Sequence, residues 1–156
     1  MVEVDIPGFG RLTLEYLVLD YNGTLACDGI LLPGAKESLQ ALAECLTIHV
    51  VTADTFGGAA EGLCGVPCTL TVLPPGDQAE AKADHLKALG AARSAAVGNG
   101  RNDGLLLKAA ALGIAVVQEE GASAETVLAA QVVCRDIRDA LALLRDTRRL
   151  VATLRS

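Results

Sequence analysis

The feature that most constrains the fold is a repeated alternation of short apolar runs with segments of helical periodicity. The first run in this alternation, Tyr16 to Leu19, is continuously apolar and stops abruptly at Asp20. A run so short and continuous is typical of a strand buried on both faces, so we expect it at the centre of a sheet. Further strands are predicted at 47–52, 69–73, 95–98, 114–117 and 131–134, and helices at 35–46, 59–63, 78–89, 104–112 and 137–154.

This order predicts a single architecture. Strands that alternate with helices through short links form a parallel sheet with helices on both faces, a doubly wound, Rossmann-like α/β fold. At the N-terminus, the runs 2–6 and 11–14 flank a Pro-Gly-Phe-Gly turn and predict a hairpin at the edge of the sheet. The length of 156 residues favours one domain over 1–156, which includes the N-terminal hairpin 2–14.

Composition excludes several functional classes. A net charge of -6 argues against general binding to nucleic acid or anionic lipid. The longest apolar stretch, 109–117, is far shorter than the roughly 20 residues of a membrane span, and the N-terminus has no leader pattern. The five cysteines are an odd number without zinc-like pairs, so we expect buried thiols in a reducing, cytoplasmic compartment.

Polar residues follow the predicted strands where ligands bind in doubly wound sheets, at the carboxyl ends. The successive strands bring them one after another to a single edge. These residues are Asp20, Asn22 and Thr24 after the first central strand, Thr52 and Asp54 after the next, Lys82 near the start of a helix, and Asn99, Asn102 and Asp103 after the fourth.

Each of these residues alone has an ordinary structural interpretation. Asp20 suits a nucleophile or a metal ligand on a rigid strand end, but it could equally cap a turn. Thr52 precedes backbone N–H groups that receive phosphate well, yet it also fits an N-cap. Lys82 could reach a phosphate or lie on the surface, and Asn102 with Asp103 could cap the next helix. Together and in this order, they favour phosphoryl transfer through an aspartyl phosphate.

The motifs LDYNGTL (19–25) and VVTAD (50–54), the isolated Lys82 and VGNGRND (97–103) resemble, in this order, the four motifs of the haloacid dehalogenase (HAD) superfamily. The resemblance spans residues 14 to 117. Within that superfamily, Thr-Ala-Asp and GNGRND look most like the phosphorylation domain of P-type ATPases, whose motifs read TGD and GDGxND. The chain therefore resembles the soluble P-type ATPase-like phosphatases.

The resemblance implies a role for each matching residue. Asp20 attacks phosphorus, and Mg²⁺ is held by its carboxylate together with the Asn22 backbone carbonyl and the Asn99 side chain. Asp103 lies in the metal's coordination shell or just behind it. The phosphate is bound by Thr52, Ala53, Lys82 and Asn102, with Asp54 and Thr24 as supporting residues. Such an oxygen-rich site suits Mg²⁺ shared with a phosphate.

Two positions depart from the common hydrolase pattern. Asn22 stands where most HAD phosphatases have an aspartate that acts as general acid and base. An amide cannot exchange a proton near neutral pH, so we expect slow turnover of alkyl phosphates and better turnover of acyl or aryl phosphates. Asn99 replaces the usual metal carboxylate, which should weaken cation binding.

The linking segments suggest an open site. Residues 25–51 and 53–81 hold little beyond the helices and strand already predicted, so a capless HAD-like core is expected. An open site admits large substrates unless a neighbouring subunit closes it, so we expect a homo-oligomer or a macromolecular phosphosubstrate. The loop 26–32, with Cys27 and Asp28, should form a flap beside the site.

Three alternatives are considered. A response-regulator receiver also uses Asp, Thr and Lys on such a sheet, but its phosphorylated Asp follows the third strand. The glycines of GNGRNDG superficially suggest a dinucleotide loop, yet the carboxylate of Asp103 would lie where a pyrophosphate binds. The alternative that stays open is a degenerate, non-catalytic HAD domain with a regulatory or phosphate-binding role, because of Asn22 and Asn99.

Overall fold

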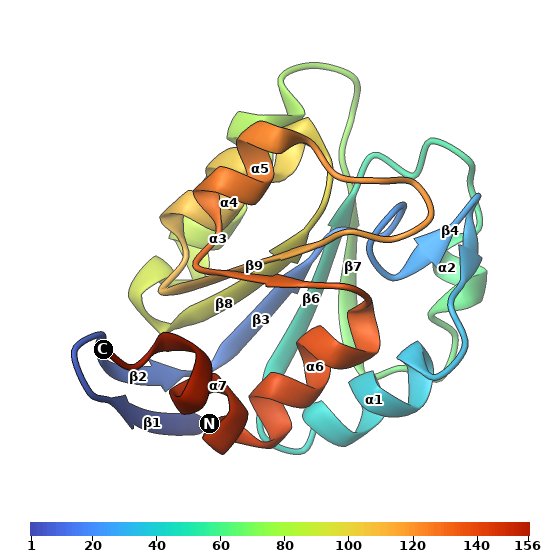
Figure 1. Cartoon of the computed structure of the whole chain (residues 1–156). Coiled ribbons are helices and arrows are strands. Elements are labelled where there is room, and N and C mark those ends of the chain that lie inside the picture. Colours follow the sequence, from blue (N-terminus) through green and yellow to red (C-terminus); the bar gives the residue numbers. More distant parts are fainter.

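The computed structural model describes residues 1–156 and places six parallel strands in one sheet (Figure 1). The strand order is β10-β9-β8-β3-β6-β7. The strands are β3 (Tyr16–Leu19), β6 (Thr47–Thr52), β7 (Cys68–Val72), β8 (Ser94–Gly98), β9 (Leu112–Val116) and β10 (Val132–Cys134). The doubly wound α/β fold and the central position of β3 are thus confirmed.

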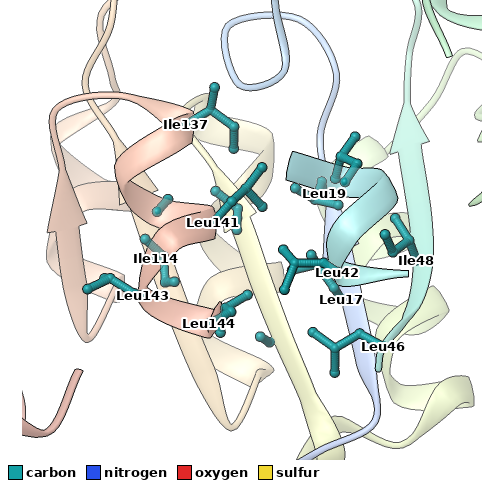
Figure 2. Packing of buried hydrophobic residues seen from close by; sticks show 14 of the residues in the cluster. Leu17, Leu19, Leu42, Leu46, Ile48, Ile114, Ile137, Leu141, Leu143 and Leu144 are labelled. Carbon is teal, nitrogen blue, oxygen red and sulfur yellow. The ribbon is translucent and has the colours of Figure 1, made fainter. Parts of the chain in front are cut away.

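Helices cover both faces of this sheet (Figure 1). One face carries α1 (Ala35–Leu42) and α6 (Ile137–Arg145), and the other carries α3 (Gln78–Leu89), α4 (Gly104–Ala109) and α5 (Ala124–Ala129). Successive residues of β3 face the two layers in turn, because side chains alternate along a strand. Leu17 and Leu19 pack with Leu42 and Leu141 (Figure 2), whereas Val18 faces the α3–α4 layer. None of the helices is both long and apolar enough to cross a membrane.

The N-terminal hairpin and the C-terminal helix meet at one end of the molecule. β1 (Val2–Ile6) and β2 (Gly10–Leu14) pair antiparallel in a sheet of their own, so their predicted position at the edge of the main sheet is wrong. α7 (Thr147–Leu154) packs against β1 instead. The hairpin is therefore covered by helix α7 and pairs with no strand of the main sheet.

Several helical segments differ from the prediction, and α1 and α4 end at Leu42 and Ala109, before the expected ends at 46 and 112. The helix expected over 137–154 breaks at Asp146, whose carboxylate accepts a hydrogen bond from the Arg148 backbone N–H and caps α7. Apolar periodicity continues across this break, so it gives no sign of two helices. The short α5 was not predicted, because six residues are too few for a periodic pattern.

The segment predicted as a flap is a small hairpin, β4 (Ala26–Cys27) with β5 (Ile30–Leu31). Its turn holds Asp28 at a φ of 50°, followed by Gly29. The hydroxyl of the buried Tyr21 donates to the Gly29 carbonyl at 3.2 Å. α2 (Ala59–Gly62) packs beside β5, so the flap rests on the segment that follows β6.

Candidate active site

The carboxyl ends of β3, β6 and β8 form the floor of a polar pocket of about 160 Å³. These strands are neighbours in the sheet, and the backbone N–H of Asp20 donates to the Val97 carbonyl at 3.1 Å. The pocket is lined by Asp20, Asn22, Thr52, Ala53, Thr55, Asn99, Gly100, Asn102 and Glu120. Most of the predicted site residues therefore meet at one edge, although they come from distant parts of the chain.

A buried lysine lies between two buried carboxylates. The Lys82 ammonium is 2.9 Å from Asp20 Oδ1 and 2.7 Å from Asp103 Oδ1. The side chains of Lys82 and Asp103 are essentially inaccessible to solvent, and that of Asp20 is 9 % exposed. Buried charges of this kind are tolerated only when they are paired, so this ion cluster fixes all three groups.

Burial has opposite effects on the pKa of Asp20 and on the pKa of Lys82. It raises the pKa of the Asp20 carboxyl to about 7; the negative charge of Asp103 adds to this rise, and Lys82 works against it. Burial also favours a lower pKa for Lys82, but Asp103 and Asp20 outweigh it and hold that pKa above its ordinary value. The lysine therefore stays charged, while the nucleophile candidate titrates close to neutrality.

Asp103 is fully engaged by the protein. Its Oδ2 accepts hydrogen bonds from the backbone N–H groups of Asn99 and Gly100, both at 2.9 Å, and its Oδ1 accepts from Lys82. A side chain at Gly98 would collide with Asp103, since its Cβ would lie 2.6 Å from the Asp103 Cβ. Because Gly98 has no side chain, Asp103 can pack against it and bind the backbone N–H groups of the loop that follows β8.

Asn99 is oriented by two hydrogen bonds. Its Nδ2 donates to the Gly121 carbonyl at 3.0 Å, and its Oδ1 accepts from the buried Thr24 hydroxyl at 3.2 Å. The amide packs directly on Gly23, whose φ is 77° and whose added Cβ would lie 2.3 Å from Asn99 Nδ2. Thr24 is therefore brought to the site, where it positions Asn99.

Thr52 and Ala53 form the next wall of the pocket. Thr52 is buried, and its Oγ1 accepts a hydrogen bond from the Asp54 backbone N–H at 3.0 Å. Asp54 does not line the pocket; its Oδ1 accepts from the Ala59 N–H at 3.3 Å, at the start of α2. Asp54 thus lies outside the pocket and stabilises the loop after β6 through these hydrogen bonds.

Two asparagines differ in how they are held. The side chain of Asn102 donates to Gln78 Oε1 at 3.1 Å, which turns its amide toward the start of α3. Asn22 Oδ1 is buried and has no hydrogen-bond partner in the protein. A buried oxygen of this type normally has a donor or a cation beside it, so it is a feature that a ligand would satisfy.

Several residues of the site were not predicted from the sequence. Gln118 donates from Nε2 to the carbonyls of Gly23 and Thr24 at 3.0 and 2.9 Å, and its Oε1 accepts from the Ile137 N–H at 2.7 Å. One amide thereby ties the loop after β3 to the start of α6. Thr55 and Glu120 line the pocket, but neither belongs to a motif. The only sequence signal for Gln118 was that it is the first polar residue after the apolar β9.

The oxygen donors present fit a hard divalent cation such as Mg²⁺, which prefers carboxylate, carbonyl and water ligands. Asp20 contributes a carboxylate at the pocket, and Asn22 Oδ1 has no partner. Asn99 Oδ1 accepts one hydrogen bond and retains a second lone pair. Asp103 instead lies behind these donors, because both of its oxygens are already bonded.

Comparisons by sequence give one curated relative. No protein-family model matches the chain. An uncharacterized protein of Methanocaldococcus jannaschii is 55 % identical over 60 residues, which cover 38 % of this chain and 64 % of that protein. The matching stretch therefore spans less than two thirds of the relative.

Among solved structures, a 3-deoxy-D-manno-octulosonate 8-phosphate phosphatase from Moraxella catarrhalis matches with a TM-score of 0.71 and 16 % identity. The match covers 90 % of this chain and 92 % of that one, which is described in complex with magnesium, phosphate and its sugar acid. The chain has the fold of the HAD-superfamily phosphatases. A zinc-transporting PIB-type ATPase matches this HAD-like fold with a TM-score of 0.55 and 25 % identity, over 78 % of this chain and 20 % of that one.

Proposed function

We propose that the chain is a HAD-type phosphohydrolase or phosphotransferase that works through an aspartyl phosphate on Asp20. The observation that carries this proposal is the buried cluster of Asp20, Lys82 and Asp103 beside a pocket of about 160 Å³. A space of that size suits a phosphoryl group with its counter-ion rather than a whole metabolite. The HAD-like fold and the resemblance of the motifs support the same reaction.

The reaction has two displacements. A carboxylate oxygen of Asp20 attacks phosphorus, the bond from phosphorus to the leaving oxygen breaks, and the leaving group departs with the electron pair. A water then attacks the same phosphorus, which breaks the aspartyl bond, restores the carboxylate and releases phosphate with a proton to solvent. Thr52, the Ala53 N–H, Lys82 and Asn102 hold the phosphate oxygens.

Lys82 has two tasks in this account. It keeps Asp20 in one position through a contact of 2.9 Å, and its charge favours the ionised nucleophile over the protonated one. Its second contact, to Asp103, fixes the ammonium from behind. Fixed charge of this kind stabilises developing negative charge on phosphate oxygens without reorganisation.

Asp20, Asn22 and Asn99 would hold Mg²⁺, with Asp103 behind them and Thr24 positioning Asn99. The resemblance implies the backbone carbonyl of Asn22 as a ligand, whereas the oxygen without a partner is the side-chain Oδ1. This Oδ1 and the free lone pair of Asn99 support a cation at this position. A bound divalent cation supplies positive charge beside the phosphate oxygens. Because Asn99 is neutral, we expect weaker cation affinity than at a site with a carboxylate in that place.

Asn22 limits the range of substrates. Its amide can neither give a proton to a leaving alkoxide nor take one from water, so an acid–base contribution of about 10²–10⁴-fold is missing. Acyl and aryl phosphates, whose leaving groups need no proton, should be turned over faster than alkyl phosphates. A long-lived phosphoenzyme is the second consequence.

The surroundings of the site complete the proposal. Between β3 and β7 the chain forms only the β4–β5 flap, α1, β6 and α2, which supports a capless site. The homo-oligomer that an uncovered site suggests and the cytoplasmic location stay predictions. All five cysteines are free, but none is buried: Cys64 is exposed and the other four are half-buried, so the expectation of buried thiols is wrong.

Phosphate release tests the proposal. We expect Mg²⁺-dependent release from acetyl phosphate and, more slowly, from p-nitrophenyl phosphate, and none from either in Asp20→Asn. The exposed Asp5, on the distant hairpin, supplies the control variant Asp5→Asn, which should retain full activity. Equal activity in Asp20→Asn would overturn the mechanism, and absence of release from the native protein would favour the non-catalytic phosphate-binding domain.

A further inference from the structure

The phosphate pocket is too small to hold a whole substrate. Its volume of about 160 Å³ is below the roughly 300–1,000 Å³ of sites that bind small molecules whole. On the proposed function, the leaving group of the substrate must therefore lie on the surface beside the pocket. The neighbouring hollows show which surface is shaped for it.

Two larger hollows lie next to the pocket, over the outer side of α4. The first, of about 420 Å³, includes Asn102, which also lines the phosphate pocket. The second, of about 480 Å³, shares Arg101, Leu105 and Glu125 with the first and extends to Leu128. We call these two hollows the α4–α5 groove. The groove adjoins the phosphate pocket at one lining residue, Asn102, which belongs to both.

The groove combines apolar side chains with charged ones of both signs: Arg101 and Lys108 are cationic, and Asp77 and Glu125 are acidic. Leu128 is 86 % exposed and Leu105 is 40 % exposed, so both offer apolar surface that nothing in the chain covers. Lys108 makes no ion pair, although the chain as a whole is acidic. Arg101 pairs with Glu125 at 3.4 Å, but both side chains are highly exposed, so this pair is weak and an anion can displace it.

Helix α5, which forms one wall of the groove, is hydrogen-bonded to the loop 99–103 of the site. The buried Thr126 of α5 donates from its hydroxyl to the Gly100 carbonyl at 2.7 Å. Just before α5, the Ser123 N–H donates to the Asn99 carbonyl at 2.8 Å. The groove therefore has a set position relative to Asn99 and the pocket. Such preorganisation favours a binding surface over an incidental depression.

We propose that the α4–α5 groove binds the leaving group of the substrate, and that this group is an aromatic or aliphatic body with a second anionic group at its far end. The apolar body lies on Leu105 and Leu128, and the anion meets Lys108 and Arg101. This inference rests on the proposed function, because it names the substrate class of the same site.

The probe is 6-phosphonooxy-2-naphthoate, whose leaving group is a flat aromatic body with a carboxylate. Acetyl phosphate is the reference, because its acetyl group is too short to reach Leu128. The groove variant is Lys108→Gln/Leu128→Ser, which changes only exposed side chains. The matched control is Arg11→Gln/Phe9→Ala on the hairpin, at the opposite end of the strands from the site (Figure 1).

For the naphthoate substrate, we expect the groove variant to raise KM about fivefold to tenfold with little change in kcat, as loss of ground-state binding predicts. Neither variant should alter turnover of acetyl phosphate. An unchanged KM in the groove variant would contradict binding of the leaving group in the α4–α5 groove. The proposed function would stand, because turnover of acetyl phosphate tests it separately.

Binding of the product, 6-hydroxy-2-naphthoate, provides a measurement that needs no catalysis. Its own fluorescence should show saturable binding to the native protein and to the control variant, and a dissociation constant raised about fivefold to tenfold in the groove variant. Equal binding by all three proteins, or no binding by any, would overturn the proposal even if no phosphate ester is hydrolysed.

Discussion

Replacement of Lys82 by methionine tests the buried ion cluster. At an effective dielectric constant of 20, each of its two contacts, at 2.9 and 2.7 Å, has a gross attraction of about 6 kcal/mol. Desolvation of the three buried groups offsets much of this attraction. Removal of one partner from a buried pair nevertheless costs about 3–5 kcal/mol, because the remaining charge is left uncompensated. Domains of this size have only about 5–15 kcal/mol of stability, so the loss should be large.

The loss should also depend on pH. Without Lys82, the carboxylates of Asp20 and Asp103 face each other, and protonation of one relieves the repulsion. The pKa of Asp20 is already raised to about 7 by burial and by Asp103, and loss of the ammonium raises it further. A group with a raised native pKa binds protons better in the folded state, so the deficit of the variant shrinks from about pH 8 to about pH 5.

Urea denaturation in the presence of a chelator measures this effect. The matched control is Lys87→Met, on the same helix, because Lys87 is exposed and pairs with the exposed Asp84 at 2.9 Å. Exposed pairs contribute little, so this control should unfold close to the native protein. An equal loss in the two variants, or a loss in Lys82→Met that is the same at both pH values, would refute the argument.

Three further variants test separate parts of the account. Asn22→Asp should raise turnover of alkyl phosphates by about 10²–10⁴-fold by restoring an acid and base, and unchanged phosphomonoesterase kinetics would contradict that role. Burial lowers the pKa of both His49 and His85, whose ring nitrogens lie 3.2 Å apart, below the ordinary value of 6.5. Stability should therefore fall as the pH drops below 6.5, and denaturation of His85→Gln should show a shallower fall. Gln118→Ala removes three hydrogen bonds to the backbone and should cost about 1–3 kcal/mol, together with a drop in kcat; full activity would show that the loop holds its shape without this amide.

The centre of the sheet was accessible from sequence because β3, β8 and β9 are buried on both faces. β3 and β6 were predicted with the bounds they have, since their apolar runs end at polar residues. The position of the N-terminal hairpin was not, because alternation within two strands does not specify what covers them. The break at Asp146 was hidden for a related reason: the apolar stripe of α6 continues into α7.

The site shows the same division. The order of Asp20, Thr52, Lys82 and Asp103 indicated that they converge, but not that Lys82 lies between two carboxylates. That contact depends on how α3 packs against the sheet. Gln118 lies outside the motifs, and its role follows only from contacts with two backbone carbonyls and one backbone N–H group, which belong to no motif.

The most direct test of the central claim is the intact mass of the protein after acid quench from acetyl phosphate and Mg²⁺. The account predicts a species heavier by one phosphoryl group in the native protein and in Asp5→Asn, mapped by fragmentation to Asp20. The Asp20→Asn variant should show none. A phosphoryl group on another residue, or equal labelling of Asp20→Asn, would contradict an aspartyl-phosphate enzyme.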